Sequence, residues 1–334
     1  MSDHARIQLG HGGGGSLMQE LIAAEFSVLY QNHAPPLHDA ARVELPHGRL
    51  AFSSDGYVVQ PLEFAGGDIG ALAVIGTAND LAMAGARPLH LSASFILEEG
   101  LPMDLLRRLL ASMAAAAQTC GVSIITGDTK VVERGKADGV FITTSGIGLV
   151  EAEGPIDPQV IRPGDQLLLS GDLGRHGLAI LAARHGLTLM VPPVSDCAPL
   201  WPQVQALLTA GITPHCLRDL TRGGLGSALQ ELAAASGCDL LLEETAIPLA
   251  PGVEVSCDLL GLDPLHLANE GRFVAVLPAA QLQPALALLE ASGGCWIGTV
   301  GDAAASLPQV RLATALGSER LLAPFSGDML PRIC

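Results

Sequence analysis

Four aspartates have positions in the sequence that suit a magnesium and nucleotide site. They are Asp55, Asp68, Asp80 and Asp128. Asp55 and Asp128 are expected next to strand ends, where carboxylates can meet a hard cation and the phosphates that it bridges. Asp80 follows Asn79 inside an otherwise apolar helix, where a carboxylate needs a partner. Each aspartate could instead be an ordinary helix cap or turn residue.

Two glycine-containing turns could hold phosphate. The first consists of Gly12, Gly13, Gly14 and Gly15 and precedes a helix start, where bare backbone N–H groups attract anions. Such a run near a terminus is more often a flexible linker or a remnant of cloning. In the second half, Asp219 and Arg222 lie in a turn that runs through Gly223-Gly224 into a helix, and this turn resembles another phosphate-facing loop.

Glu270 and Cys334 are side chains that could move protons or form bonds. Glu270 precedes a predicted strand; it could pair with Arg272, or act as a general base if it lies in a cleft. Cys334 is the last residue and follows a stretch that contains proline and glycine. A thiol on such a tail can be loaded at one site and presented to another, although its position could be an accident of where the chain stops.

Composition excludes several functional classes. The 334-residue chain has a formal net charge of −16, so we expect neither a nucleic-acid surface nor binding to anionic lipid. No apolar run approaches the roughly 18 residues of a membrane span, and there is no secretory signal. The seven cysteines are scattered without a CxxC pair, which favours reduced thiols and a cytoplasmic location. Lys130 is one of only two lysines, and lysine, unlike arginine, can lose its proton.

Hydrophobic periodicity predicts alternating strands and helices in both halves. In the first half we expect helices over 16–30, 69–84 and from 102 onward, and strands over 50–54, 57–60, 89–97, 122–126 and 140–150. Ser16 with Gln19 predicts a capping box, Asp68 a helix cap, and Asp55-Gly56 a turn. In the second half we expect strands over 166–170, 240–243, 273–277, 296–300 and 309–313, and helices over 174–185, 203–210, 224–236 and 279–291.

These elements predict an α/β (α+β) fold with two mixed domains. The stretch 151–164, which is rich in proline and glycine, is expected to connect them. We place an N-terminal arm and helix at 1–37, an N-terminal α/β domain at 38–153, a C-terminal α+β domain at 154–320 and a mobile tail at 321–334. Fully extended, that tail would reach roughly 46–50 Å, so we expect both inward and outward tail states.

Taken together, the motifs resemble the HypE family of hydrogenase maturation proteins over essentially the whole chain. The segments that carry the resemblance are SSDGYVVQPLEFAGGDIGALAVIGTANDLAMAGARP, GDTKVV, DLTRGG, ANEGR, GHGGGGSLMQELI and the terminal PRIC. The SSDG, ND, GDT and DLTRGG elements recur across the superfamily of aminoimidazole ribonucleotide synthetase, selenophosphate synthetase and thiamine monophosphate kinase, whereas PRIC is far more specific. The resemblance implies an N-terminal domain that forms a dimeric β-barrel and a second domain that covers the nucleotide cleft.

The resemblance also implies an ATP-dependent carbamoyl dehydratase. A carbamoyltransferase, HypF, would load Cys334, ATP would drive dehydration to a thiocyanate, and cyanide would pass to iron held by a HypC–HypD complex for [NiFe]-hydrogenase. Asp55, Asp80 and Asp128 would hold Mg²⁺, while Lys130 and Glu270 would act at the thiol, with Glu270 as the base. The residues expected to bind nucleotide are Gly12, Gly13, Gly14, Gly15, Asp55, Asp68, Asn79, Asp80, Asp128, Thr129, Asp219 and Arg222.

Three alternatives differ in what they leave unexplained. Another ATP-using member of the superfamily would not account for PRIC, and selenophosphate synthetase would have a cysteine or lysine in the glycine loop. A non-catalytic thiol carrier, in which ATP only moves the tail, would bind nucleotide without turning it over. A zinc or redox protein would need a clustered cysteine pair, which the sequence lacks.

Overall fold

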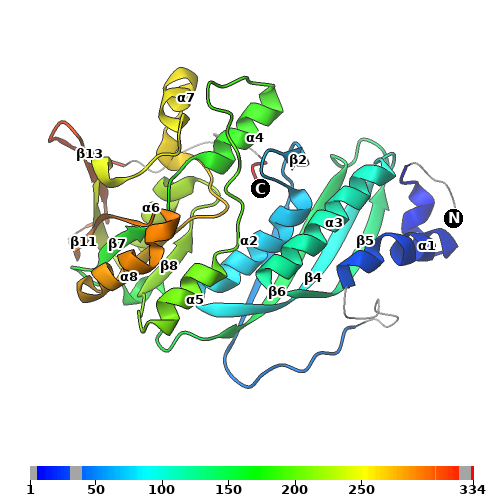
Figure 1. Ribbon diagram of the computed structural model, residues 1–334, viewed down its shortest axis with the longest axis horizontal. Coiled ribbons are helices and arrows are strands. Elements are labelled where there is room, and N and C mark those ends of the chain that lie inside the picture. Colours follow the sequence, from blue (N-terminus) through cyan, green and yellow to red (C-terminus); the bar gives the residue numbers. More distant parts are fainter. Residues whose placement is uncertain (1–5, 31–39, 305, 323–331) are drawn as a thin grey trace. The chain divides into compact units, whose positions relative to one another are not determined.

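The computed structural model describes residues 6–30, 40–304, 306–322 and 332–334, which divide between two compact units (Figure 1). Unit 1 takes its residues from Met1–Leu81, Ala86–Val150 and Cys334, and unit 2 from Ala82–Gly85 and Glu151–Ile333. Helices and strands mix in both units, which confirms the predicted mixed α/β class. Among the described residues, no helix combines the length and apolar character needed to cross a lipid bilayer.

Unit 1 is built on a four-stranded sheet with the order β1-β6-β4-β5. β1 (Leu50–Tyr57) and β4 (Ala86–Glu98) pair antiparallel with β6 (Val140–Val150), and β5 (Ser123–Val132) pairs parallel with β4. α2 (Ile69–Met83) and α3 (Met103–Cys120) cover one face (Figure 1). The smaller elements are η1 (Leu9–Gly12), α1 (Ser16–Ala24), η2 (Phe26–Tyr30), β2 (Glu63–Phe64) and β3 (Gly67–Asp68).

A buried chain of hydroxyl groups fixes α2 against the sheet. The Thr77 hydroxyl on α2 bonds to the Tyr57 hydroxyl on β1 at 3.2 Å and to the Thr144 hydroxyl on β6 at 2.6 Å. Gly76 permits this approach, because a Cβ there would lie 2.4 Å from the Tyr57 hydroxyl oxygen. The contact sets the position of the next turn of α2, which carries Asp80.

The other face of the unit 1 sheet exposes apolar side chains. Phe52 is 71% exposed, and the strand register places Leu50 and Ile96, also exposed, on the same face. β1 and β5 are the two edges of the sheet, so within the described part of one chain the sheet stays open. The barrel that the sequence leads us to expect would therefore need a second copy.

Unit 2 contains a seven-stranded sheet with the order β13-β12-β9-β11-β7-β10-β8. Its strands are β7 (Gln166–Leu169), β8 (Cys216–Asp219), β9 (Cys238–Glu243), β10 (Phe273–Leu277), β11 (Cys295–Ala303), β12 (Val310–Ala313) and β13 (Glu319–Leu321). Its helices are α4 (Arg175–His185), α5 (Trp201–Thr209), α6 (Gly224–Ser236), α7 (Val253–Leu260) and α8 (Leu282–Leu289). β12 pairs parallel with β9, and the other neighbours pair antiparallel.

Both faces of the unit 2 sheet are buried at β7 and β10. Along β7, Leu167 and Leu169 belong to a core that contains residues of α6, whereas Leu168 belongs to a second core with residues of α5 and α8. β10 alternates between the same two cores. Strands covered on both faces are apolar at every position, which explains the uninterrupted runs LLL and FVAVL in the sequence.

Several predicted strand boundaries differ from the structure, and those near Asp55 and Asp128 affect site residues. The turn expected at Asp55-Gly56 does not form, because β1 continues through both residues in register with β6. β5 extends to Val132, so Asp128 and Lys130 lie within the strand and not after it. In both cases pairing with a neighbouring strand keeps the chain extended, although the local sequence, Asp55-Gly56 in β1 and Gly127-Asp128 in β5, also suits a turn.

The two predicted helix caps have different outcomes. The capping box at Ser16 is wrong, because Gly15 is the N-cap of α1 and Ser16 is the first helical residue. The cap at Asp68 is confirmed: its Oδ1 accepts hydrogen bonds from the backbone N–H groups of Gly70 and Ala71 at 2.8 and 2.9 Å. Asp68 thus satisfies two of the donors that the start of α2 leaves open.

Candidate functional site

Asp55 and Asp80 lie on the same side of β1. Asp80 Oδ2 accepts a hydrogen bond from Ser53 Oγ at 2.6 Å, so the partner of this mid-helix carboxylate is a β1 serine. Ser53, Asp55 and Tyr57 alternate onto the face of β1 that packs against α2. Asp55 Oδ1 accepts from its neighbouring Gly56 N–H at 2.7 Å, and Asn79 is buried beside Asp80 in α2.

Asp128 and Lys130 form an exposed ion pair along β5. Lys130 Nζ donates to both carboxylate oxygens of Asp128 at 2.7 Å, and the Thr129 backbone N–H donates to Asp128 Oδ1 at 2.8 Å. Because the pair is exposed, it contributes little to stability and can exchange partners. Little stability would therefore be lost if Asp128 exchanged Lys130 for a cation of higher charge that arrives with a ligand.

The glycine run lies beside β5. A Cβ on Gly12 would meet the Val131 backbone nitrogen at 2.8 Å, so this residue packs directly on the strand that carries Asp128. Gly14 has a φ of 76°, a left-handed conformation that glycine adopts without strain. The run is thus an ordered connection between η1 and α1 whose position against β5 depends on the absence of a side chain.

The three carboxylates expected to hold Mg²⁺ do not meet within one copy of unit 1. Asp55 and Asp128 lie on the edge strands β1 and β5, with β6 and β4 between them. Three strand spacings amount to roughly 14 Å, which is too far for two ligands of one ion. Correspondingly, no group of three histidine, cysteine, aspartate or glutamate side chains in the described residues could hold a metal.

Asp68 has a mainly structural environment. Burial raises its pKa, while hydrogen bonds from Ser112 and from the first turn of α2 act in the opposite direction. Its hydrogen bonds with the backbone N–H groups of Gly70 and Ala71 both go to that helix. Its expected role in binding nucleotide stays a prediction, and its position as a cap accounts for its presence without that role.

The terminal cysteine has a defined place in unit 1. The Cys334 carbonyl oxygen accepts a hydrogen bond from the Val58 backbone N–H at 3.0 Å. Val58 directly follows β1 and lies three residues after Asp55. Cys334 itself is partly exposed. The structure thus brings the last residue to the end of the strand that carries one of the predicted metal ligands.

In unit 2, Glu270 lies in a buried loop before β10. The carboxylate of Asp196 holds this loop in place. The Asp196 carboxylate accepts from the backbone N–H groups of Glu270 and Gly271, each at 3.2 Å. A Cβ on Gly271 would lie 1.9 Å from the Asp196 carbonyl oxygen, so the loop requires glycine there. Arg272, the expected structural partner of Glu270, instead bonds to Asp172 Oδ1 at 2.7 Å.

The turn before α6 places Asp219 and Arg222 differently. Asp219 ends β8, is buried, and accepts a hydrogen bond from Arg218 Nη1 at 3.0 Å. Arg222 is exposed and directly precedes Gly223 and Gly224. These glycines have φ of 77° and 59° and lead the chain into α6. An exposed guanidinium at the N-terminus of a helix suits an anion, whereas Asp219 contributes to the structure of the turn.

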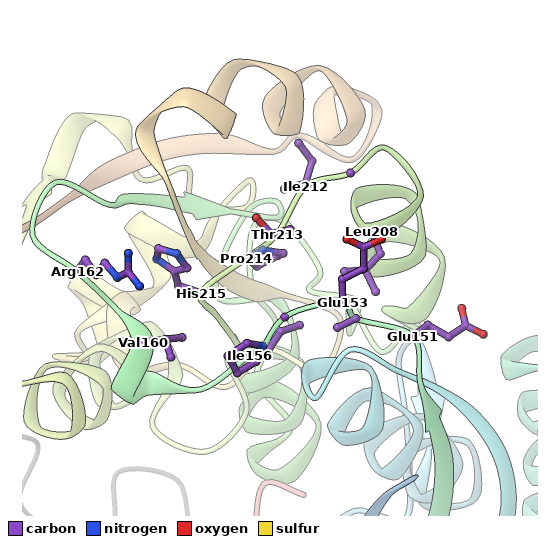
Figure 2. A pocket seen from close by; sticks show the side chains of 14 residues that line it. Glu151, Glu153, Ile156, Val160, Arg162, Leu208, Ile212, Thr213, Pro214 and His215 are labelled. Carbon is purple, nitrogen blue, oxygen red and sulfur yellow. The ribbon is translucent and has the colours of Figure 1, made fainter. Parts of the chain in front are cut away.

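The cavity in Figure 2, about 230 Å³ in volume, contains none of the predicted site residues. It lies in unit 2 between the segment that holds Glu151, Glu153 and Ile156 and the loop from Ile212 to His215. Its walls combine aliphatic residues, glycine and proline with the polar side chains of Glu151, Glu153, Arg162, Thr213 and His215. We therefore assign the chemistry to the residues described above and not to this cavity.

Sequence reasoning missed several polar residues that position the others. They are Asp196, which anchors the Glu270 loop, and His176, Arg184 and Ser195, which contact or support the last residues of the chain. The bonds of Asp196, Arg184 and His176 to these segments join residues 74 to 157 positions apart, and the bond between His176 and Ser195 spans 19, which a single sequence does not reveal. Only His176 had a local signal, since it stands between glycines at a helix start.

Thiol labelling should distinguish Cys334 from four cysteines whose thiols have a raised pKa. Burial raises the pKa of Cys120 and Cys216 to about 12, and that of Cys257 and Cys295 to about 11. At pH 8 only about one part in 10³–10⁴ of these four would be thiolate, the form that reacts. We expect iodoacetamide followed by peptide mass spectrometry to modify Cys334 well before them. Equal labelling of Cys120 and Cys334 in the folded protein would contradict this.

Comparison with known proteins gives full-length matches. Residues 37–150 match the N-terminal domain family of AIR synthase related proteins, and residues 162–307 match the corresponding C-terminal domain family. Carbamoyl dehydratase HypE of Rhodobacter capsulatus is 49% identical over 338 residues, which cover 98% of both chains. A crystal structure of the hydrogenase maturation protein HypE in complex with ATP has a TM-score of 0.93 at 46% identity, covering 98% of this chain and 99% of that one. A chain from a HypE–HypF complex has a TM-score of 0.78 at 40% identity, covering 92% and 99%.

Proposed function

Because the chain belongs to the HypE family of carbamoyl dehydratases, we propose that it removes water from a carboxamide carried on its own terminal thiol, Cys334. The product would be an S-cyanide, which could supply a cyanide ligand to the iron of a [NiFe]-hydrogenase. The observation that carries this proposal is the bond between the Cys334 carbonyl and Val58, three residues beyond Asp55. It supports a tethered substrate that is presented at the strand expected to bind nucleotide.

The proposed reaction needs ATP because the oxygen of an amide is a poor leaving group. The carboxamide oxygen would attack the γ-phosphorus, so that an O–P bond forms and the bond to ADP breaks. Loss of two protons from nitrogen and cleavage of the C–O bond would then give the S-cyanide and inorganic phosphate. A HypE relative that binds ATP supports this choice of co-substrate. We assign nucleotide binding to the residues predicted above, with Arg222 and the Gly12–Gly15 run facing phosphate.

Glu270 and Lys130 are the proposed proton-transfer groups. Glu270 is buried and its loop is fixed by Asp196, so its carboxylate would be held in one place while it accepts a proton. Lys130 can change partners, because its ion pair with Asp128 is exposed. If Asp128 turns to a metal ion, Lys130 would be released to orient Glu270 or to relay the second proton.

The donor set fits Mg²⁺ only if two copies of the chain contribute. Carboxylate oxygens are the ligands that Mg²⁺ prefers. Asp55 on β1, with Asp80 of α2 beside that strand, supplies them at one edge of the sheet, and Asp128 on β5 supplies them at the other. We propose a homodimer in which the exposed faces of two unit 1 sheets pack together and the β1 edge of one copy approaches the β5 edge of the other. Burial of Phe52, Leu50 and Ile96 would favour this barrel. Bound Mg²⁺ would offset the charge of the transferring phosphoryl group.

Mixing two variants tests the shared site. Asp55→Asn and Asp128→Asn should each lower dehydration strongly, because each removes one ligand from every site. A mixture that exchanges subunits should recover about a quarter of wild-type activity, since half of the dimers are mixed and each mixed dimer has one intact site. Activity is measured as cyanide released per chain. If each variant lost all activity and the exchanged mixture recovered none, all ligands would lie within one copy of the chain.

The proposed partners are a HypF-type carbamoyltransferase and a HypC–HypD complex. A related HypE chain has been solved in complex with HypF, which supports the first. The second is what the family resemblance implies, and it fits the proposed product, because a cyanide donor needs an iron-bearing acceptor.

Isotope transfer tests the proposed reaction directly. Cys334 is loaded by the carbamoyltransferase from carbamoyl phosphate labelled with ¹⁸O in its carbonyl, and ATP is then added. We expect one ¹⁸O atom in each inorganic phosphate released, because the carboxamide oxygen leaves as part of phosphate. Unlabelled phosphate, formed while the adduct stays intact, would instead indicate a thiol carrier that hydrolyses ATP only to move its tail.

A further inference from the structure

A buried histidine of unit 2 holds the backbone near the end of the chain. His176 is fully buried in the first turn of α4. Its Nε2 donates to the Ile333 carbonyl at 2.9 Å, and its Nδ1 accepts from Ser195 Oγ at 2.8 Å. Burial lowers the pKa of His176, while the bond to Ile333 and the charge of Asp196 act in the opposite direction. A neutral ring with one donor and one acceptor matches both contacts.

Two further features hold the same segment. Arg184, at the other end of α4, donates from Nη2 to the Arg332 carbonyl at 2.7 Å. The Ile333 side chain is 3% exposed, so it is packed as a core residue. Both carbonyls of the segment Arg332-Ile333 are therefore bound by side chains of one helix, and the apolar side chain between them is anchored.

The docked segment has an unfavourable backbone conformation. Arg332 has a φ of 56°, and among the described residues it is the only non-glycine with a positive φ. Residues with a Cβ enter the left-handed region only at a cost, so docking must be maintained by the surrounding contacts. Because strain opposes the two hydrogen bonds and the burial of Ile333, docking should be reversible.

We propose that His176 and Arg184 are positioning residues that form a latch for the tail and hold Cys334 in place for dehydration. The inference rests on the proposed function and extends it to these two residues. The two hydrogen bonds from His176 and Arg184 go to backbone carbonyls and not to the thiol, so they can form when the thiol is free, carbamoylated or cyanated. Opening it would expose Cys334 to the carbamoyltransferase that loads it, and closing it would return the loaded thiol.

Two substitutions of Arg332 separate backbone conformation from charge. Arg332→Pro forbids a positive φ, because the proline ring fixes φ near −65°, so the latch cannot close. Arg332→Asn also removes the guanidinium but tolerates the left-handed conformation. Arg184→Met removes the donor and keeps the apolar part of the side chain, and Arg311→Met, at a partly buried arginine that bonds to Asp239 and Gln309, is its control. All four variants keep the buried His176.

Trimming by a carboxypeptidase, followed by intact-mass spectrometry, measures the docked fraction. The trimming rate of each protein is divided by the rate for a synthetic peptide that has the same last four residues as that protein. We expect Arg332→Pro and Arg184→Met to be trimmed about tenfold faster than wild type. Arg184→Met loses a hydrogen bond from a charged donor, and Arg332→Pro cannot adopt the backbone conformation that docking requires. Arg332→Asn and Arg311→Met should be trimmed at nearly the wild-type rate. Trimming of Arg332→Pro at the wild-type rate would overturn the latch.

A second readout tests positioning. On protein already carbamoylated, single-turnover dehydration should be slower in Arg332→Pro and Arg184→Met and restored in Arg332→Asn, whereas the rate of loading should not fall in any of them. Faster trimming with unchanged dehydration would overturn the positioning role. If wild-type protein itself failed to dehydrate the adduct, the proposed function would fail, and the trimming rates would still decide whether the latch exists.

Discussion

Replacing Cys334 with alanine should abolish both carbamoyl loading and cyanide formation, to below detection. The reason is stoichiometric: in the proposed reaction the terminal thiol carries the substrate, so without it there is no group to dehydrate. The fold should not change, because Cys334 is partly exposed and its hydrogen bond with Val58 uses a backbone oxygen that alanine keeps. The measurement is cyanide yield per chain after incubation with the carbamoyltransferase, carbamoyl phosphate and ATP.

Cys295→Ala is the matched control for that variant. Cys295 is also partly exposed, but it lies in β11 and its thiol donates to the Ala246 carbonyl, away from the proposed chemistry. We expect it to give the wild-type cyanide yield. Undiminished cyanide from Cys334→Ala would show that another residue carries the carbamoyl group and would refute the tethered-substrate account.

Glu270→Gln should lower the single-turnover rate of dehydration by about 10²- to 10⁴-fold, the range over which a positioned base contributes. Glutamine has the same shape and leaves the two backbone bonds to Asp196 in place, so the loop should keep its structure. It cannot accept the proton from the carboxamide nitrogen. The rate is followed on carbamoylated protein after addition of ATP, which removes any effect on loading.

Glu290→Gln provides the comparison, because Glu290 is an exposed glutamate of unit 2 outside the proposed site. It should dehydrate at the wild-type rate. Lys130→Met should also be slow if Lys130 orients the base or relays a proton. Wild-type rates in both Glu270→Gln and Lys130→Met would remove both residues from the mechanism.

The sequence predicted the structure best where a few neighbouring residues determine it. Asp68 was predicted as a cap from its position before an apolar helix, and it caps α2. The run FVAVL was predicted as the strand 273–277, since five consecutive apolar residues between Arg272 and Pro278 suit a short buried strand, and β10 has those bounds. In such cases the information lies within a few neighbouring residues.

Prediction failed where a residue far away in the sequence determines the local structure. Asp55-Gly56 has the local chemistry of a turn, but β6 pairs with it and keeps β1 extended. α7 was not predicted, and it packs through Val253 and Cys257 against residues of other elements. The division of Asp55 and Asp128 between two sheet edges depends on strand order, which the spacing of the motifs does not contain. The same holds for the bonds from His176 and Arg184 to the end of the chain.

Intact-mass spectrometry of the protein during one cycle tests the central claim most directly. The chain is incubated with the carbamoyltransferase and carbamoyl phosphate, separated from them, and then given ATP with Mg²⁺. The account predicts an adduct of one carbamoyl group on Cys334 whose mass falls by one water only after ATP is added. An adduct that keeps its full mass while ATP is consumed would contradict the account and favour a carrier that does no chemistry on its cargo.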